Sequence, residues 1–137
     1  VFYIVSGAAY QFSLDDIDEN IIGLYMEKDW CLSYFSLINQ KPSEATIKAY
    51  SDMEVIEIST TSVHELIARS PTFFQLGKIL EQTVSRIKYF DNANTALQKH
   101  NHLLLYKPAL FQKFPLKMIA SYLKVAPETL SRIRSIK

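Results

Sequence analysis

KMIASYLKVAPETLSRIR, residues 117–134, is the stretch of this sequence that decides the fold. Its apolar residues recur at helical spacing on both sides of a short break, in the two pairs Ile119 with Leu123 and Leu130 with Ile133. The break falls at residues 125–127. Pro127 suits the first turn of a second helix, because an N–H at that position would have no partner within the helix and its loss costs nothing. Glu128 then places negative charge at the positive end of that helix. The stretch therefore predicts two short helices joined by a tight turn.

The same residues resemble the helix-turn-helix of the cyclic-AMP receptor protein and fumarate-nitrate regulator superfamily of transcription regulators. The match covers IASYLKVAPETLSRIR and is closest to the short members with an IASYLG-like first helix. Lys124 departs from the family pattern, which has a glycine at the turn, and the chain ends at Lys137 without the wing strands of many members. The resemblance implies a DNA-reading second helix, whereas the bare pattern also fits an ordinary pair of packing helices.

The second helix offers a set of side chains that suits base recognition. Glu128 and Arg132 are four residues apart and so share one helix face. Arginine can bind guanine O6 and N7, and glutamate can accept from cytosine N4; the resemblance adds Ser131 to this set. We expect the other cations of the region to hold phosphates, namely Lys117, Lys124 and Arg134. The alternative is an exposed salt bridge within the helix, which contributes only about 0.3 to 0.5 kcal/mol.

A long helix is predicted over residues 71–93. Pro71 suits its first turn, and no proline follows within it. Apolar residues with one polar member recur at alternating spacings of three and four, as in a heptad seam: Phe73, Leu76, Leu80, Thr83, Ile87 and Phe90. We expect this seam to join two copies of the chain in a parallel homodimer, although burial within one domain is the alternative.

The first sixty residues predict an all-β region. Aromatic and β-branched residues alternate over the ranges 1–14, 21–26, 45–50 and 54–58, and helical spacing follows over 61–68. The resemblance extends here through FYIVSGAAYQF and implies an α+β fold: a cyclic-nucleotide-binding-like β-roll, or jelly roll, then a long dimerisation helix and a C-terminal helix-turn-helix. The expected domains are 1–70 for effector sensing, lacking its N-terminal part, 71–93 for dimerisation and 94–137 for DNA binding.

The effector pocket departs from the nucleotide-binding members of the family. There a Gly-Glu pair and a later Arg hold the ribose and the cyclic phosphate, and by resemblance their places fall on Leu32, Ser33 and Ser43. No cation remains in those three places, and neither Lys41 nor Lys88 reproduces the forked contact of an arginine. The sequence therefore predicts a small-molecule effector other than cyclic AMP. The candidate pocket residues are Leu32, Ser33, Tyr34, Ser43 and Lys88.

The charges divide the chain into two unlike halves. Residues 1–70 hold 11 Asp and Glu against 4 Lys and Arg, a net of −7, whereas residues 71–137 hold 3 against 11, a net of +8. A basic half attracts a polyanion, because lysine and arginine displace the counterions of phosphates. Double-stranded DNA is therefore the expected partner, with a second copy of the chain and RNA polymerase as further candidates.

Several other classes of protein find little support in the sequence. Cys31 is the only cysteine, so neither an internal disulfide nor a four-cysteine metal set can form. His100 and His102 turn apart on a helix, and we expect them in solvent-facing or capping roles rather than as metal ligands. No apolar run reaches the roughly 18 residues of a membrane span, and no enzyme motif is recognisable.

The sequence leaves two functions open. The first is a cytoplasmic transcription regulator without a metal or an assigned cofactor, which the resemblance favours. The second is a small-molecule binding module, similar to a cyclic-nucleotide-binding domain, whose helical tail makes protein contacts. The basic half that carries Glu128 and Arg132 is the feature that separates the two.

Overall fold

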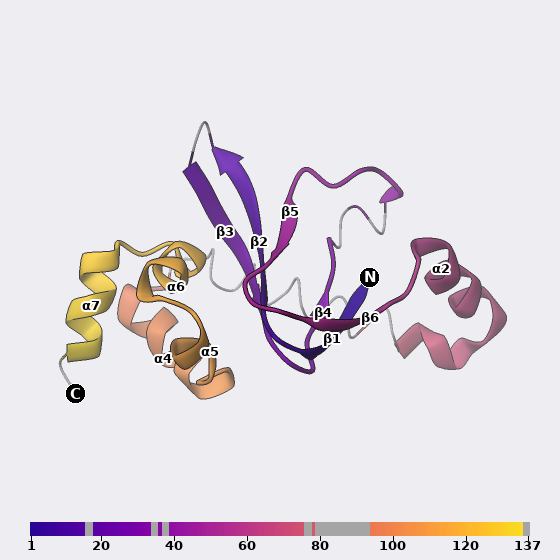
Figure 1. The fold of residues 1–137 in the computed structure, drawn as a ribbon. Helices are drawn as coiled ribbons and strands as arrows, with labels where there is room; N and C mark the ends of the chain where they lie inside the picture. The colour runs from indigo at the N-terminus through magenta and orange to yellow at the C-terminus, as the bar shows by residue number, and fades with distance from the viewer. Residues whose placement is uncertain (16–17, 34–35, 37–38, 76–77, 79–93, 136–137) are drawn as a thin grey trace.

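The computed structural model describes residues 1–15, 18–33, 36, 39–75, 78 and 94–135 (Figure 1). Strands fill the first part and helices the last. The elements are β1 (Phe2–Ser6), β2 (Ala9–Asp15), β3 (Asp18–Tyr25), β4 (Trp30–Cys31), β5 (Thr46–Ala49), β6 (Glu54–Glu57), α2 (Thr60–Arg69), the 3-10 helix η1 (Pro71–Phe73), α4 (Ala96–Tyr106), α5 (Leu110–Lys113), α6 (Leu116–Leu123) and α7 (Pro127–Ser135). The predicted order of strands followed by helices is confirmed.

The described strands form two antiparallel sheets of three, in the orders β4-β1-β6 and β3-β2-β5. The run predicted over residues 1–14 is in fact two strands, because the chain passes from one sheet to the other at Gly7. Gly7 has a φ of 89°, and a Cβ there would lie 2.3 Å from the carbonyl oxygen of Asp52. Only glycine meets both conditions.

The β2–β3 hairpin extends further than its composition predicts. The polar composition of residues 15–20 predicts a turn, yet β2 runs to Asp15 and β3 starts at Asp18, and these two residues pair across the hairpin. The polar side chains from Asp18 to Asn20 are exposed, while the backbone of these residues pairs with β2. Hydrophilic residues are compatible with a strand that faces solvent.

Helices α2, α6 and α7 lie where the sequence predicts helices, over residues 61–68 and on the two sides of the break at 125–127. Helix α2 begins at the N-cap Ser59, whose Oγ accepts from Ser62 N at 3.1 Å, and α4 begins with a capping box between Thr95 and Gln98. The short helix α5 is not predicted by the sequence, since four residues between two prolines carry too little periodicity.

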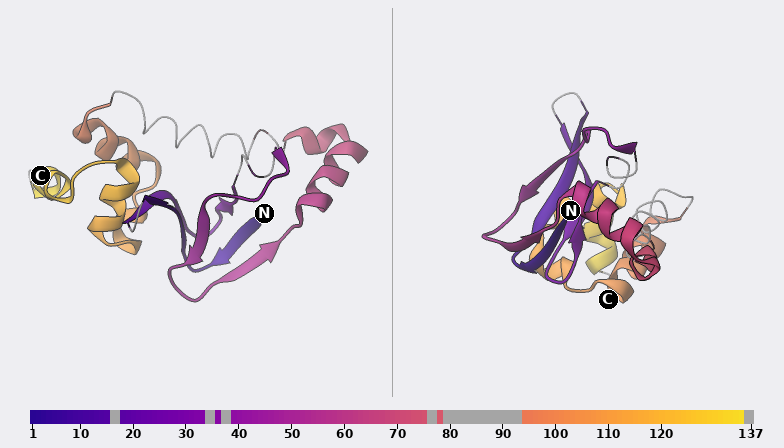
Figure 2. Two further views of the ribbon diagram at one scale, coloured as in Figure 1. Left: turned by 90° about the horizontal axis from the view of Figure 1, so that it is seen from above. Right: turned by 90° about the vertical axis from the view of Figure 1, so that its right-hand side faces the viewer.

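The main hydrophobic core joins the β2–β3 hairpin to the C-terminal helices. Its most buried members come from both parts of the chain: Ala8, Phe12, Ile21, Leu24, Leu103, Leu110, Phe114, Ile119, Ala120, Leu123 and Leu130. Helix α6 lies against β3, with α7 on its far side (Figures 1 and 2). The expected boundary between sensing and DNA-binding domains is thus bridged by one continuous core.

The structure tests the predicted place of His100 but leaves most of the predicted helix over residues 71–93 untested. Most of the predicted helix over 71–93, including its seam beyond Phe73, lies outside the described residues, and Phe73 itself is 38% exposed. The expectation that His100 lies in solvent or at a cap is wrong: it is 5% exposed, and its ring packs 5.2 Å from that of Phe111. Its Nδ1 lies 3.2 Å from Asn101 Oδ1, which satisfies one ring nitrogen.

Candidate nucleic-acid interface

The turn between α6 and α7 is built around Lys124. This residue takes the left-handed conformation, with φ 57° and ψ 46°. Its N–H donates to Ser121 O at 3.1 Å, and Val125 N donates to Ala120 O at 2.9 Å, the pattern of a Schellman C-cap. The family's glycine suits this conformation without strain, so the departure seen in the sequence falls where lysine has a steric cost.

A buried lysine completes the same cap. Lys99 on α4 is buried, and its Nζ donates to Leu123 O at 2.9 Å. A cation at the C-terminal end of a helix meets the negative end of the helix dipole and an unpaired carbonyl. The sequence did not reveal this contact, because Lys99 lies 24 residues from its partner.

Helix α7 presents its polar face to solvent because its other face is anchored. Leu130 is 0% exposed and belongs to the main core. The residues predicted to contact DNA are all exposed, and they lie on α6, on the turn and on α7: Lys117, Lys124, Glu128, Ser131, Arg132 and Arg134. The fold thus gathers the predicted set at one end of the molecule.

The side chains of α7 make few contacts with one another. Arg132 Nη2 lies 3.5 Å from Thr129 Oγ1, and within the part of the chain described no ion pair links Arg132 to Glu128. The alternative of an intrahelical salt bridge thus has no support in this conformation. The guanidinium of Arg134 lies 5.2 Å from the centre of the Phe111 ring, a cation–π contact that the sequence did not predict.

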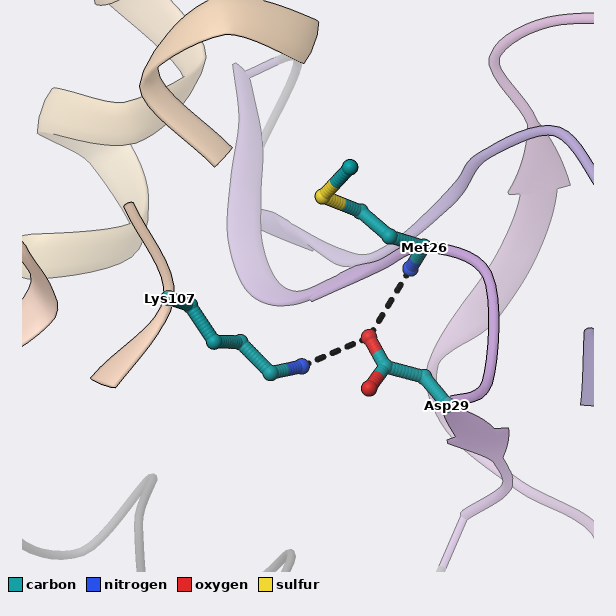
Figure 3. Close-up of polar contacts among 3 residues, drawn as sticks. All are labelled: Met26, Asp29 and Lys107. Atoms are coloured by element: carbon teal, nitrogen blue, oxygen red, sulfur yellow. Dashed lines mark hydrogen bonds and ion pairs between the residues drawn. The ribbon is translucent and has the colours of Figure 1, made fainter. Parts of the chain in front are cut away.

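Two polar contacts tie the helices to the sheet beneath them. Ile21 N on β3 donates to Ser121 Oγ on α6 at 3.0 Å. Asp29 Oδ2 accepts from Lys107 Nζ at 2.6 Å and from Met26 N at 2.9 Å, so one carboxylate oxygen joins the loop after β3 to the end of α4 (Figure 3). The first contact holds α6 on the β2–β3 hairpin, and the second holds the end of α4 against the loop that follows β3.

The structure describes three of the five predicted effector residues. Leu32 is buried and Ser33 is partly buried, whereas Ser43 is exposed and its Oγ bonds within its own turn to Ala45. Tyr34 and Lys88 lie outside the described residues. Beside them, burial raises the pKa of the Cys31 thiol to about 12, so this thiol is protonated at neutral pH.

Metal-binding clusters and membrane spans are both absent from the described residues. No group of three or more His, Cys, Asp or Glu is placed to hold a metal ion in that part of the chain. No helix among the same residues is long and apolar enough to cross a membrane.

Comparisons with known proteins place this fold among bacterial regulators. No protein-family model and no curated protein matches the sequence. Solved structures do match: one described as a Crp/Fnr-family transcriptional regulator from Eubacterium rectale, with 17% identity over 96% of this chain and a TM-score of 0.65; CooA from Carboxydothermus hydrogenoformans, with 15% identity over 98% and a TM-score of 0.65; and the c-di-GMP-responsive regulator CLP from Xanthomonas campestris, with 19% identity over 98% and a TM-score of 0.58.

These matches establish the fold of the chain. It is a small α+β protein with the cyclic-nucleotide-binding fold of Crp/Fnr regulators, as the sequence resemblance predicted. It covers 66%, 65% and 74% of those three structures, so it spans about two thirds of the first two. The first and the third of these structures are described as regulators.

Proposed function

We propose that this chain belongs to a cytoplasmic, DNA-binding transcription regulator of the Crp/Fnr type. The observation that carries the proposal is the exposed face of α7, where Glu128, Ser131 and Arg132 stand free of ion pairs within the described chain while Leu130 anchors the opposite face. A recognition helix needs this combination, since base edges must be reached by unoccupied donors and acceptors on a rigid support.

In this proposal the exposed residues divide into two roles. Glu128, Ser131 and Arg132 read base edges in the major groove. Phosphates are held by the surrounding cations, which are Lys117, Lys124 and Arg134. The cation–π contact of Arg134 with Phe111 supports this role, because it limits the motion of the side chain while leaving it exposed.

The regulator would act as a parallel homodimer. We propose the seam Phe73, Leu76, Leu80, Thr83, Ile87 and Phe90 as the joint between the two copies. The exposure of Phe73 in the single chain is compatible with a partner surface there. Two-fold symmetry then requires an inverted-repeat operator, with half-sites roughly 34 to 36 Å apart.

The regulator would respond to a small-molecule signal sensed by the sheets, and it would communicate with RNA polymerase as its further partner. Cyclic AMP is not that signal in our proposal, because Leu32, Ser33 and Ser43 occupy the places of the residues that hold the nucleotide in other family members. The buried position of Leu32 and the turn bonds of Ser43 leave neither free for a phosphate.

A selection of binding sites from genomic fragments, followed by affinity measurements on the selected operator and a scrambled duplex, tests the proposal. Arg132→Ala should cost about 1 to 3 kcal/mol per half-site on the operator and little on scrambled DNA. Lys117→Ala, a matched change at an exposed cation on α6, should weaken both duplexes alike and flatten the salt dependence. If no duplex is enriched, or if Arg132→Ala weakens both duplexes equally, the assignment of α7 as the reading helix is wrong.

A further inference from the structure

Two consecutive polar residues of α4, Lys99 and His100, are buried where this helix packs against α6 and α7 (Figure 1). They are 8% and 5% exposed. Lysine is rarely buried without a charged partner, yet no ion pair links Lys99 to a carboxylate within the part of the chain that the structure describes. Burial of an ammonium group is unfavourable, and an apolar side chain would fill the same space without that cost. The two residues therefore do more than fill the core.

Lys99 acts at the turn that leads into α7. Its Nζ donates to Leu123 O at 2.9 Å, whereas the backbone bonds of the turn end on the carbonyl groups of Ala120 and Ser121. Leu123 is 0% exposed, so without Lys99 its carbonyl group must either stay buried without a donor or reach water by an opening of the turn. The bond thus fixes the direction in which the chain leaves α6 and enters α7.

His100 acts at the other end of α7. Its ring packs against that of Phe111 on α5, with the two centroids 5.2 Å apart. The guanidinium of Arg134, in the last turn of α7, lies 5.2 Å from the centre of the same Phe111 ring. Between these two points Leu130 is buried in the main core. Helix α7 is therefore attached at its start, its middle and its end, and α4 supports the first and the last attachment.

We propose that Lys99 and His100 are positioning residues for α7. Lys99 sets the start of the helix through the turn, and His100 sets its end through Phe111. Neither contacts DNA; together they fix the angle at which Arg132 meets the base edges. The consequence for DNA recognition rests on the proposed function, whereas the orientation of α7 does not. A forked contact with a base depends on direction, so loss of this support reduces discrimination between sequences more than attraction to phosphates.

The orientation is tested without DNA, by residual dipolar couplings of the backbone amides of α6 and α7 in the full chain. In the unmodified protein one rigid orientation should fit both helices. Lys99→Met keeps a long stem but removes the donor, and the couplings of α7 should depart from that fit. His100→Ala should displace the couplings of the last turn of α7. An unchanged fit in either variant overturns the proposal for that residue.

Two matched variants separate positioning from general loss of stability. Lys107→Met removes the lysine of α4 that bonds to Asp29, far from the turn in sequence. His102→Ala removes a histidine of α4 whose ring packs 4.4 Å from that of Tyr106 within the same helix. Both variants should keep the unmodified fit. If they displace α7 as much as Lys99→Met and His100→Ala do, any damage to α4 has the same effect and the proposal is wrong.

The effect on recognition is measured on the selected operator and the scrambled duplex. Lys99→Met should lower the ratio of the two affinities at least about fivefold, within the loss expected for one base contact, and change the affinity for scrambled DNA less than about twofold. Lys107→Met should keep the ratio. If the unmodified chain does not discriminate between the duplexes, the proposed function fails, while the couplings still test the positioning. If it does discriminate, an unchanged ratio in Lys99→Met overturns the proposal.

A conservative variant shows whether the hydrogen bond itself matters. Lys99→Arg keeps a cationic donor that can bond to Leu123 O, so it should retain the couplings and the affinity ratio of the unmodified protein. A loss as large as that of Lys99→Met would mean that the shape of the side chain, and not its bond to the turn, positions α7. That outcome would overturn the part given to Lys99.

Discussion

The two ends of this molecule are built differently. At the α7 end, leucines and isoleucines from α4, α5, α6 and α7 are almost fully buried against the β2–β3 hairpin. At the α2 end, Val63 is the one buried residue of α2, η1 has none, and the four residues of β6 are all exposed. The first end is complete within a single chain and suits rigid presentation of α7. The second leaves apolar side chains such as Val55, Ile56 and Phe73 exposed, which is compatible with the homodimer proposed above.

The largest expected effect tests the difference in packing. Leu123→Ala, at a position that is 0% exposed, should lower the free energy of unfolding by about 2 to 5 kcal/mol. Val63→Ala at the other end should cost only about 1.5 kcal/mol, since two methyl groups are lost from a thinner core. Urea denaturation followed by circular dichroism measures both.

The matched control for that comparison is Leu105→Ala, because Leu105 is 76% exposed on α4. It should change the unfolding free energy by no more than about 0.5 kcal/mol. Equal losses for Leu123→Ala and Val63→Ala would show that the two ends are packed alike and remove the basis of the contrast.

The next effect concerns the polar connection between helices and sheet. Asp29→Ala removes the acceptor of both Lys107 and Met26 N and should cost about 1 kcal/mol. The side chains of Lys107 and Asp29 are 27% and 19% exposed, so solvent screens the attraction between their charges. A double-mutant cycle with Lys107→Met should therefore give a coupling free energy of only about 0.5 kcal/mol. A coupling of zero would mean that Asp29 contributes to stability only by accepting the hydrogen bond from Met26 N.

The last effect has the opposite sign. Lys124→Gly should raise the free energy of unfolding by about 1 kcal/mol, because the left-handed conformation at the turn is strained for a residue with a Cβ. Lys124→Ala removes the same charge but keeps the strain, so it should leave stability nearly unchanged. Thermal unfolding of the two variants separates backbone strain from charge, and equal midpoints would contradict the role given to the turn.

The sequence by itself determined the features that depend on neighbours along the chain. The helical pairs that begin at Ile119 and Leu130, the break before Pro127 and the alternation of the strands all arise from local periodicity and backbone chemistry. The exposed polar set on α7 belongs to this group, since helical spacing alone separates Arg132 from the buried Leu130.

The tertiary structure decided what depends on residues distant in sequence. Ser121 bonds to Ile21 across 100 positions, and Lys107 bonds to Asp29 across 78. It also buried His100, whose polarity predicted exposure, by placing it against Phe111. Such contacts have no periodicity along the chain, because they arise only when the packing of apolar faces fixes how the helices lie on the sheet.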